Sequence, residues 1–160
     1  MKIFVVVGTQ EPFDRMVKAI DIWARNNSTH SIFAQISRAE YKPESLRFTD
    51  FISPELFDQH FKEADLIVSH AGMGTIISAL RLSKPIIVMP RLAAMHEHRN
   101  DHQLATAKSF EKLGYVKAAY SEEELNKALD AAERIIPAAE IGPGASVQLI
   151  NTIKNFIDKS

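Results

Sequence analysis

Residues 65–90, DLIVSHAGMGTIISALRLSKPIIVMP, decide the fold of this chain. The run from Asp65 to Ser69 is short and apolar, as expected of a strand that a parallel sheet covers on both faces. His70–Thr75 then turns the chain into a helix expected over Ile76–Leu82, and a second buried strand ends at Pro90. The stretch therefore predicts a strand, a glycine turn, a helix and a second strand.

The glycine turn has the composition of a phosphate site. Gly72 and Gly74 carry no β-carbon, so backbone N–H groups at the start of the helix can approach an anion closely. The helix dipole and the Thr75 hydroxyl favour the same negative charge, and His70 adds a ring donor at the strand tip. The alternative is a tight turn whose histidine is hydrogen-bonded within the protein.

The amino terminus repeats this arrangement. Lys2–Val7 is an apolar strand, and Gly8 and Thr9 follow it directly. The next segment has apolar residues at helical spacing, which are Phe13, Met16, Val17, Ile20 and Trp23. Because ligands of open α/β sheets bind outside the carboxyl ends of the strands, we expect Gly8 and Thr9 to line the same crevice as His70–Thr75. An ordinary strand-to-helix loop is the alternative.

Length and composition narrow the class of protein. The chain has 160 residues, of which 46% are apolar, enough for one core, and we expect a single domain over residues 1–160. The formal charge is −1 with no basic stripe, which disfavours nucleic acid as a partner. There is no cysteine, which excludes disulfides and thiolate metal sites and suits a cytoplasmic protein. No apolar run approaches the roughly 18 residues that span a bilayer.

The rest of the chain alternates strand and helix patterns. Strands are expected at 31–36, 46–51 and 115–119, and helices at 54–64, 100–113, 122–135 and after 142–144. Ser53 is a predicted N-cap, Gly114 a predicted helix end, and Ser121–Glu124 a capping box. This alternation predicts an α/β fold with a Rossmann-like, doubly wound parallel sheet.

These segments resemble the carboxyl-terminal, nucleotide-sugar-binding half of the family 28 glycosyltransferases. VVVGTQEPFDRMV (5–17), SHAGMGT (69–75), KPIIVMP (84–90) and NDHQLATA (100–107) fall in the family's order, so the resemblance covers nearly the whole chain. It is greatest to soluble subunits of two-component transferases, which act in dolichol-linked glycan assembly or in bacterial capsular and exopolysaccharide synthesis. The resemblance implies one half of a two-domain GT-B transferase, with a UDP-sugar as donor substrate and no cofactor.

The resemblance and the residue chemistry together give a set of candidate donor-binding positions. His70 and Gly72 take the positions that meet the donor diphosphate, and Gln103 takes that of a glutamine that reads donor hydroxyls. The full set is Gly8, Thr9, His70, Gly72, Met73, Gly74, Thr75, Ser78, Arg91, His98, Asp101, His102 and Gln103.

Two positions depart from the family pattern. Ser78 stands where many relatives carry a glutamate that grips both ribose hydroxyls, and a serine can bond only one of them. His102 stands directly before Gln103, where some relatives carry an acid, and Asp101 lies one place earlier.

The histidine-rich segment 96–102 also has zinc-like spacing, since His98 and His102 are four residues apart. We favour a polar loop over an anionic donor and expect no metal, because the helix is expected to begin only near Asn100. Arg91 and Arg99 fit such a loop as phosphate-binding guanidinium groups, with solvated surface as the alternative.

The resemblance further implies that the acceptor half is a separate membrane-anchored subunit holding a lipid-linked sugar acceptor. It would recruit this chain to the cytoplasmic face of the membrane. In the last helix a stripe of Ile150, Ile153, Phe156 and Ile157 either docks on that partner or packs on the chain's own sheet. No residue of this chain is assigned as the catalytic base. The alternative is a base on the partner subunit.

The function predicted from the sequence is therefore that of a soluble subunit of an inverting, two-component UDP-sugar transferase. A non-catalytic accessory subunit that stimulates a partner is the alternative, and the Ser78 departure favours it slightly. A flavodoxin-like signalling module is a third possibility, although the strand ends show no acidic phospho-acceptor cluster.

Overall fold

A parallel sheet of six strands forms the centre of the computed structural model, which describes residues 1–137 and 147–158, apart from the side chains at positions 148, 156 and 157. The strand order is β3-β2-β1-β4-β5-β6, and every neighbouring pair is parallel. The strands are β1 Lys2–Val6, β2 Ser31–Gln35, β3 Arg47–Thr49, β4 Leu66–His70, β5 Ile86–Met89 and β6 Lys117–Ala118.

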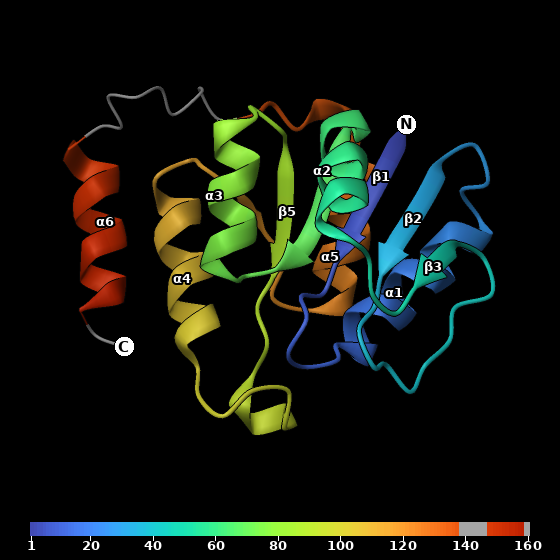
Figure 1. Ribbon diagram of the computed structural model, residues 1–160, viewed down its shortest axis with the longest axis horizontal. Helices are drawn as coiled ribbons and strands as arrows, with labels where there is room; N and C mark the ends of the chain where they lie inside the picture. The colour runs from blue at the N-terminus through green and yellow to red at the C-terminus, as the bar shows by residue number, and fades with distance from the viewer. Residues whose placement is uncertain (138–146, 159–160) are drawn as a thin grey trace.

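Helices cover both faces of this sheet (Figure 1). They are α1 Asp14–Arg25, α2 Pro54–Glu63, α3 Met73–Arg81, α4 His102–Lys112, α5 Glu122–Asp130 and α6 Val147–Ile157, with 3-10 turns at Ala93–Met95 and Ala132–Arg134. Figure 1 shows α1 and α5 on one face and α2, α3 and α4 on the other, with α6 beside α4. The sequence-based expectation of an α/β fold with a doubly wound parallel sheet is therefore confirmed.

Two apolar cores result, one on each face, and β1 contributes to both because its side chains alternate. Ile3 and Val5 belong to the core under α1 and α5. Phe4 and Val6 belong to the core under α2, α3 and α4. This two-sided burial explains why the strands are nearly continuous apolar runs in the sequence.

The direction of winding reverses between β1 and β4. From β1 the chain builds β2 and β3 outward on one side, and it then returns to build β4, β5 and β6 on the other. Such a reversal leaves a crevice outside the carboxyl ends of the two central strands, where ligands of this fold class bind. Gly8 follows β1 and His70 ends β4, so both lie at this crevice.

The helix after β4 begins earlier than the sequence pattern predicts. Gly72 has extended backbone angles and is the N-cap of α3, whose first residue is Met73 rather than Ile76. The predicted turn over His70–Thr75 is therefore too long. Met73, Gly74 and Thr75 form the first helical turn, and this brings the amino end of α3 closer to the crevice.

The predicted helix signals are present in the structure. The Ser53 hydroxyl accepts a hydrogen bond from Leu56 N (3.3 Å), and Gly114 has a φ of 75° after α4. The Ser121 hydroxyl accepts from Glu124 N (3.2 Å), while the Glu124 carboxylate accepts from Tyr120 N (2.8 Å). Boundaries differ: α4 begins at residue 102 rather than 100, and α5 ends at Asp130 rather than 135.

The last helix packs on its own domain through one side. Leu149 is buried in the second core and Ile153 packs against it, whereas Val147 and Ile150 are 74% and 39% exposed. The stripe predicted from the sequence is therefore divided between a packed and an exposed side. The segment 142–144 and the side chains at 156 and 157 lie outside the described residues. Among the described helices, none has the length and hydrophobicity of a membrane span.

A buried carboxylate fastens the turn-rich segment after β2 to α1. Asp21, with no exposed surface, accepts hydrogen bonds from Tyr41 Oη (2.6 Å), Ser45 N (2.6 Å) and Glu44 N (3.1 Å). Burial raises the pKa of Asp21, but these hydrogen bonds outweigh it, and the pKa is lowered below its ordinary value.

We expect Asp21→Ala to lower the free energy of unfolding at pH 7 by about 2–4 kcal/mol, because it leaves two backbone donors unpaired. Since the native pKa is depressed, the carboxylate stabilises the fold above about pH 4, and this contribution is lost as the pH falls through the native pKa. Urea denaturation at pH 7 and in acid measures both effects, with exposed Asp58→Ala as the matched control. Equal losses in the two variants would contradict the assignment.

Candidate functional site

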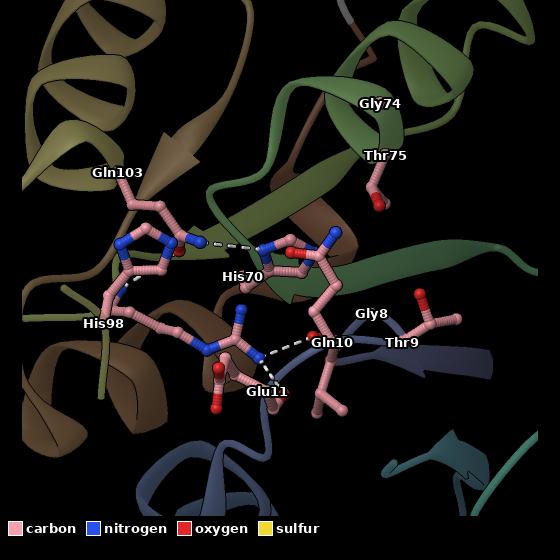
Figure 2. Close-up of a pocket in the computed structure, with 11 residues that line it drawn as sticks. Gly8, Thr9, Gln10, Glu11, His70, Gly74, Thr75, His98 and Gln103 are labelled. Atoms are coloured by element: carbon pink, nitrogen blue, oxygen red, sulfur yellow. Dashed lines mark hydrogen bonds between the residues drawn. The ribbon is translucent and has the colours of Figure 1, made fainter. Parts of the chain in front are cut away.

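A pocket of about 300 Å³ opens at the carboxyl ends of β1 and β4 (Figure 2). Its walls come from the loop after β1, the end of β4, the first turn of α3, the segment after β5 and the start of α4. The lining residues are Val7, Gly8, Thr9, Gln10, Glu11, His70, Gly74, Thr75, Arg91, His98 and Gln103. The structure thus brings most of the sequence-predicted site residues together at the crevice between the two central strands.

The other candidates do not line this pocket, and they are Gly72, Met73, Ser78, Asp101 and His102. Ser78 donates to Gly74 O (3.0 Å) along its own helix and lies at a different hollow, between α2 and α3. Asp101 accepts from Ala93 N (2.9 Å), and the His102 side chain is exposed. None of these three side chains lines this pocket, and their contacts with the donor stay a prediction.

The imidazole of His70 lies against two glycines. A β-carbon on Gly72 would lie 2.0 Å from His70 Cε1, and one on Gly8 would lie 3.0 Å from His70 Nε2. Gly8 also has a φ of 85°, a conformation that disfavours any other residue. The structure thus gives a reason for glycine at position 72 that the sequence did not show: it makes room for the His70 ring.

A short chain of hydrogen bonds fixes the ring of His70. Arg91 N donates to Gln103 Oε1 (3.2 Å), and Gln103 Nε2 lies 3.2 Å from His70 Nδ1, as the dashed line in Figure 2 shows. Burial lowers the pKa of His70 to about 3, and the Arg91 charge acts in the same direction. The imidazole is therefore neutral at physiological pH.

The amino end of α3 opens onto the pocket without a side-chain cap. Gly72 makes no capping hydrogen bond, so the first backbone N–H groups of α3 have no partner within the helix. Nothing lies within 4 Å of the place where a β-carbon of Gly74 would stand. Thr75 lies at the pocket wall in Figure 2. The Met73 side chain instead packs against the second core.

Arg91 is a buried cation that lines the pocket, so the solvated-surface alternative is wrong for it. It is 4% exposed, donates to Val7 O (2.7 Å) and Glu11 O, and lies over the Phe13 ring. Its Nε has no hydrogen-bond partner among the described residues. Burial lowers its pKa to about 10, so it remains charged at neutral pH.

An ion pair ties the segment between β5 and α4 to α1. Both carboxylate oxygens of Glu97 accept from Arg15, at 2.6 Å from Nε and 2.8 Å from Nη2, and Glu97 also accepts from Leu92 N (2.9 Å). This pair is largely buried, with 9% and 12% of the two side chains exposed. It holds the segment that carries His98 at the pocket.

The same segment contains the histidines with zinc-like spacing. Within residues 1–137 and 147–158, no group of three His, Asp or Glu side chains is placed to hold a metal ion. His98 lines the pocket, whereas His96, Arg99 and His102 are exposed.

The sequence reasoning missed Gln35, which holds the glycine loop from behind. Gln35 is 2% exposed; its Oε1 accepts from Gly8 N (3.2 Å), and its Nε2 donates to Gly8 O (2.9 Å) and Asp50 O (3.0 Å). The available signal was a glutamine near the end of the strand predicted at 31–36. Gln10 and Glu11 were also missed as lining residues, although they directly follow Thr9.

The strand order and this crevice define the chain as a doubly wound α/β domain of the Rossmann type. Residues 2–140 match the model of the glycosyltransferase family 28 C-terminal domain. The chain belongs to this family, as its motifs suggested.

Known proteins are similar in sequence to parts of this chain. The UDP-N-acetylglucosamine transferase subunit ALG13 of Candida albicans is 36% identical over 87 residues, which are 54% of this chain and 28% of that protein. The UDP-N-acetylglucosamine--N-acetylmuramyl-(pentapeptide) pyrophosphoryl-undecaprenol N-acetylglucosamine transferase of Geobacillus kaustophilus is 42% identical over 69 residues, or 43% of this chain and 18% of that protein. This chain therefore spans less than a third of either relative.

A solved structure shows the same fold. The NMR solution structure of ALG13 superposes with a TM-score of 0.61 at 23% identity, covering 85% of this chain and 88% of that one. The agreement in fold extends over most of both chains.

Gly72→Ala and Gly74→Ala test whether the His70 ring requires a glycine at position 72 but not at position 74. We expect Gly72→Ala to lower the free energy of unfolding by about 2 kcal/mol or more, because the new methyl group collides with the His70 ring. Gly74→Ala meets open space in the first turn of α3, so we expect no loss and a gain of up to about 1 kcal/mol. Thermal or urea unfolding of both variants measures this, and the opposite order would refute the packing described for His70.

Proposed function

We propose that this chain is the donor-binding subunit of an inverting, two-component glycosyltransferase. It binds a UDP-sugar in the pocket at the ends of β1 and β4, and the sugar passes to a lipid-linked acceptor held by a membrane-anchored partner. The observation that carries the proposal is the uncapped amino end of α3 opening onto a pocket that also contains His70 and the charged Arg91.

The groups around the pocket suit a pyrophosphate. A helix amino terminus attracts anions through its free N–H groups and its dipole. Arg91 adds a full positive charge that, among the described residues, has no carboxylate within ion-pairing distance. Glu11 is the one acidic side chain among the described lining residues, and it lies on the loop after β1.

These groups would act mainly on the leaving group. The acceptor hydroxyl oxygen attacks the anomeric carbon as the bond from that carbon to the β-phosphate oxygen breaks, which inverts the configuration. The negative charge that develops on the departing UDP would be stabilised by the N–H groups of α3, the Thr75 hydroxyl and the His70 ring. The acceptor proton goes to a general base, which we assign to the partner subunit.

The names of the relatives support the donor class and the division into subunits. ALG13 of Candida albicans is a UDP-N-acetylglucosamine transferase subunit, and the Geobacillus kaustophilus relative acts on a pyrophosphoryl-undecaprenol substrate. UDP-N-acetylglucosamine is therefore the first donor to test, with a polyprenyl-linked sugar as the first acceptor.

A second candidate function is that of a non-catalytic accessory subunit. It is favoured by the position of Ser78, which lies outside the pocket and so supplies no ribose contact there. Transfer by the complex of this chain with its partner distinguishes the two functions. A donor-binding subunit loses transfer on His70→Ala while the complex still assembles, whereas an accessory subunit does not.

Calorimetric titration with UDP tests the donor site directly. We expect UDP to bind, UMP to bind more weakly, and His70→Ala to weaken UDP binding by roughly tenfold or more, because a hydrogen bond to a charged phosphate is lost. His102→Ala is the matched control, since it removes an exposed imidazole outside the pocket. Absence of UDP binding, or equal effects of the two substitutions, would be evidence against the proposal.

A further inference from the structure

We infer that Gln103 is a positioning residue that holds His70 in one neutral form, with its proton on Nε2, so that the ring presents an N–H donor to the pocket. The inference rests on the proposed function, because the donor is useful only if an anion binds there. It gives Gln103 a role different from the reading of donor hydroxyls that the family resemblance implies.

The backbone of Arg91 fixes the orientation of the Gln103 amide. The backbone N–H of Arg91 can only donate, so the amide atom 3.2 Å from it must be the oxygen. The amide nitrogen is then the atom that faces His70. Gln103 is 8% exposed and follows the first residue of α4, so its packing restricts the side chain to this arrangement.

The Gln103 amide nitrogen in turn fixes the tautomer of His70. An amide nitrogen carries hydrogens and has no lone pair to offer, so His70 Nδ1, 3.2 Å away, must accept the hydrogen bond. A nitrogen that accepts carries no proton. The single ring proton of neutral His70 is therefore on Nε2.

The proton on Nε2 faces the Gly8 backbone. His70 Nε2 is the ring atom nearest to the position that a β-carbon on Gly8 would take, at 3.0 Å. The absence of a side chain at Gly8 leaves Nε2 uncovered, and Gln35 holds the Gly8 peptide in place through both its N–H and its C=O. His70 and Gly8 both line the pocket, and we therefore infer that the Nε2–H group can donate to a ligand bound there.

Protonation of His70 conflicts with this arrangement. A proton on Nδ1 would face the Gln103 amide N–H, and turning the amide over would place its nitrogen against Arg91 N–H instead. The charged or titratable groups near the ring are Arg91 and His98 from the segment after β5, and Glu11 from the loop after β1. Burial and the Arg91 charge disfavour a second cation and lower the pKa of His70 to about 3.

Two consequences follow for the proposed reaction. His70 binds the pyrophosphate as a neutral hydrogen-bond donor, and the required form is present throughout the physiological pH range. His70 also has no free lone pair, because Nδ1 accepts from Gln103 and Nε2 carries the proton. It therefore does not serve as the base that deprotonates the acceptor, which agrees with a base on the partner.

Long-range nitrogen–proton NMR of the histidine-labelled chain reads the tautomer directly. We expect His70 in the unmodified chain to show a protonated Nε2 and an unprotonated Nδ1, with no titration between pH 5.5 and 8. In Gln103→Glu a carboxylate oxygen faces Nδ1 and demands a proton there, so we expect a protonated Nδ1. Gln10→Glu is the matched control: it adds the same charge to the same pocket without touching this chain of hydrogen bonds, and should leave the tautomer unchanged.

The NMR results that would overturn the inference differ from the result that would overturn the proposed function. A protonated Nδ1 in the unmodified chain overturns the inference, and so does an Nε2–H tautomer that survives Gln103→Glu. If Gln103→Glu does not fold, Gln103→Met removes the hydrogen bond without a charge and is expected to give a mixture of both tautomers; an unchanged single tautomer there also overturns it. UDP titration of the unmodified chain tests the proposed function separately, since failure to bind UDP leaves the ligand-free tautomer as it is.

Discussion

The packing of the His70 imidazole between two glycines is the constraint on which the site depends. His70 ends β4, Gly8 follows β1 and Gly72 caps α3, so the ring joins the two central strands at the point where the winding reverses. A side chain at either glycine would displace the ring. The crevice that this fold class leaves open thus contains an imidazole held at a defined distance from the amino end of α3.

A buried positive charge completes the site, and distant parts of the chain hold it there. Arg91 fastens the loop after β1 through Val7 O and Glu11 O, while its backbone N–H orients Gln103. Burying a cation without an ion pair is costly, and groups whose pKa burial perturbs in this way cluster at functional sites. The Arg15–Glu97 ion pair then holds the segment between β5 and α4 in position.

Much of the fold and part of the site were predictable from the sequence, because they depend on residues close together in the chain. The strand and helix periodicities predicted the doubly wound sheet, Ser53 and Ser121 predicted helix starts, and two polar turns after apolar strands predicted a shared crevice. Hydrogen-bond partners far apart in the sequence were not predictable, and Gln35 with Gly8 is an example. The position of Ser78 outside the pocket was also not predictable, because α3 begins three residues early and the Ser78 hydroxyl bonds to its own helix. Asp101 and His102 stand at the start of α4, where both are exposed and neither lines the pocket.

The central claim is that a pyrophosphate binds where the amino end of α3 meets the His70 ring, and a crystal structure of the chain with UDP tests it most directly. The account predicts phosphate oxygens within hydrogen-bonding distance of the backbone N–H groups of Gly74 and Thr75 and of His70 Nε2. A nucleotide bound on another face of the domain, with this pocket filled by the protein's own side chains, would contradict it.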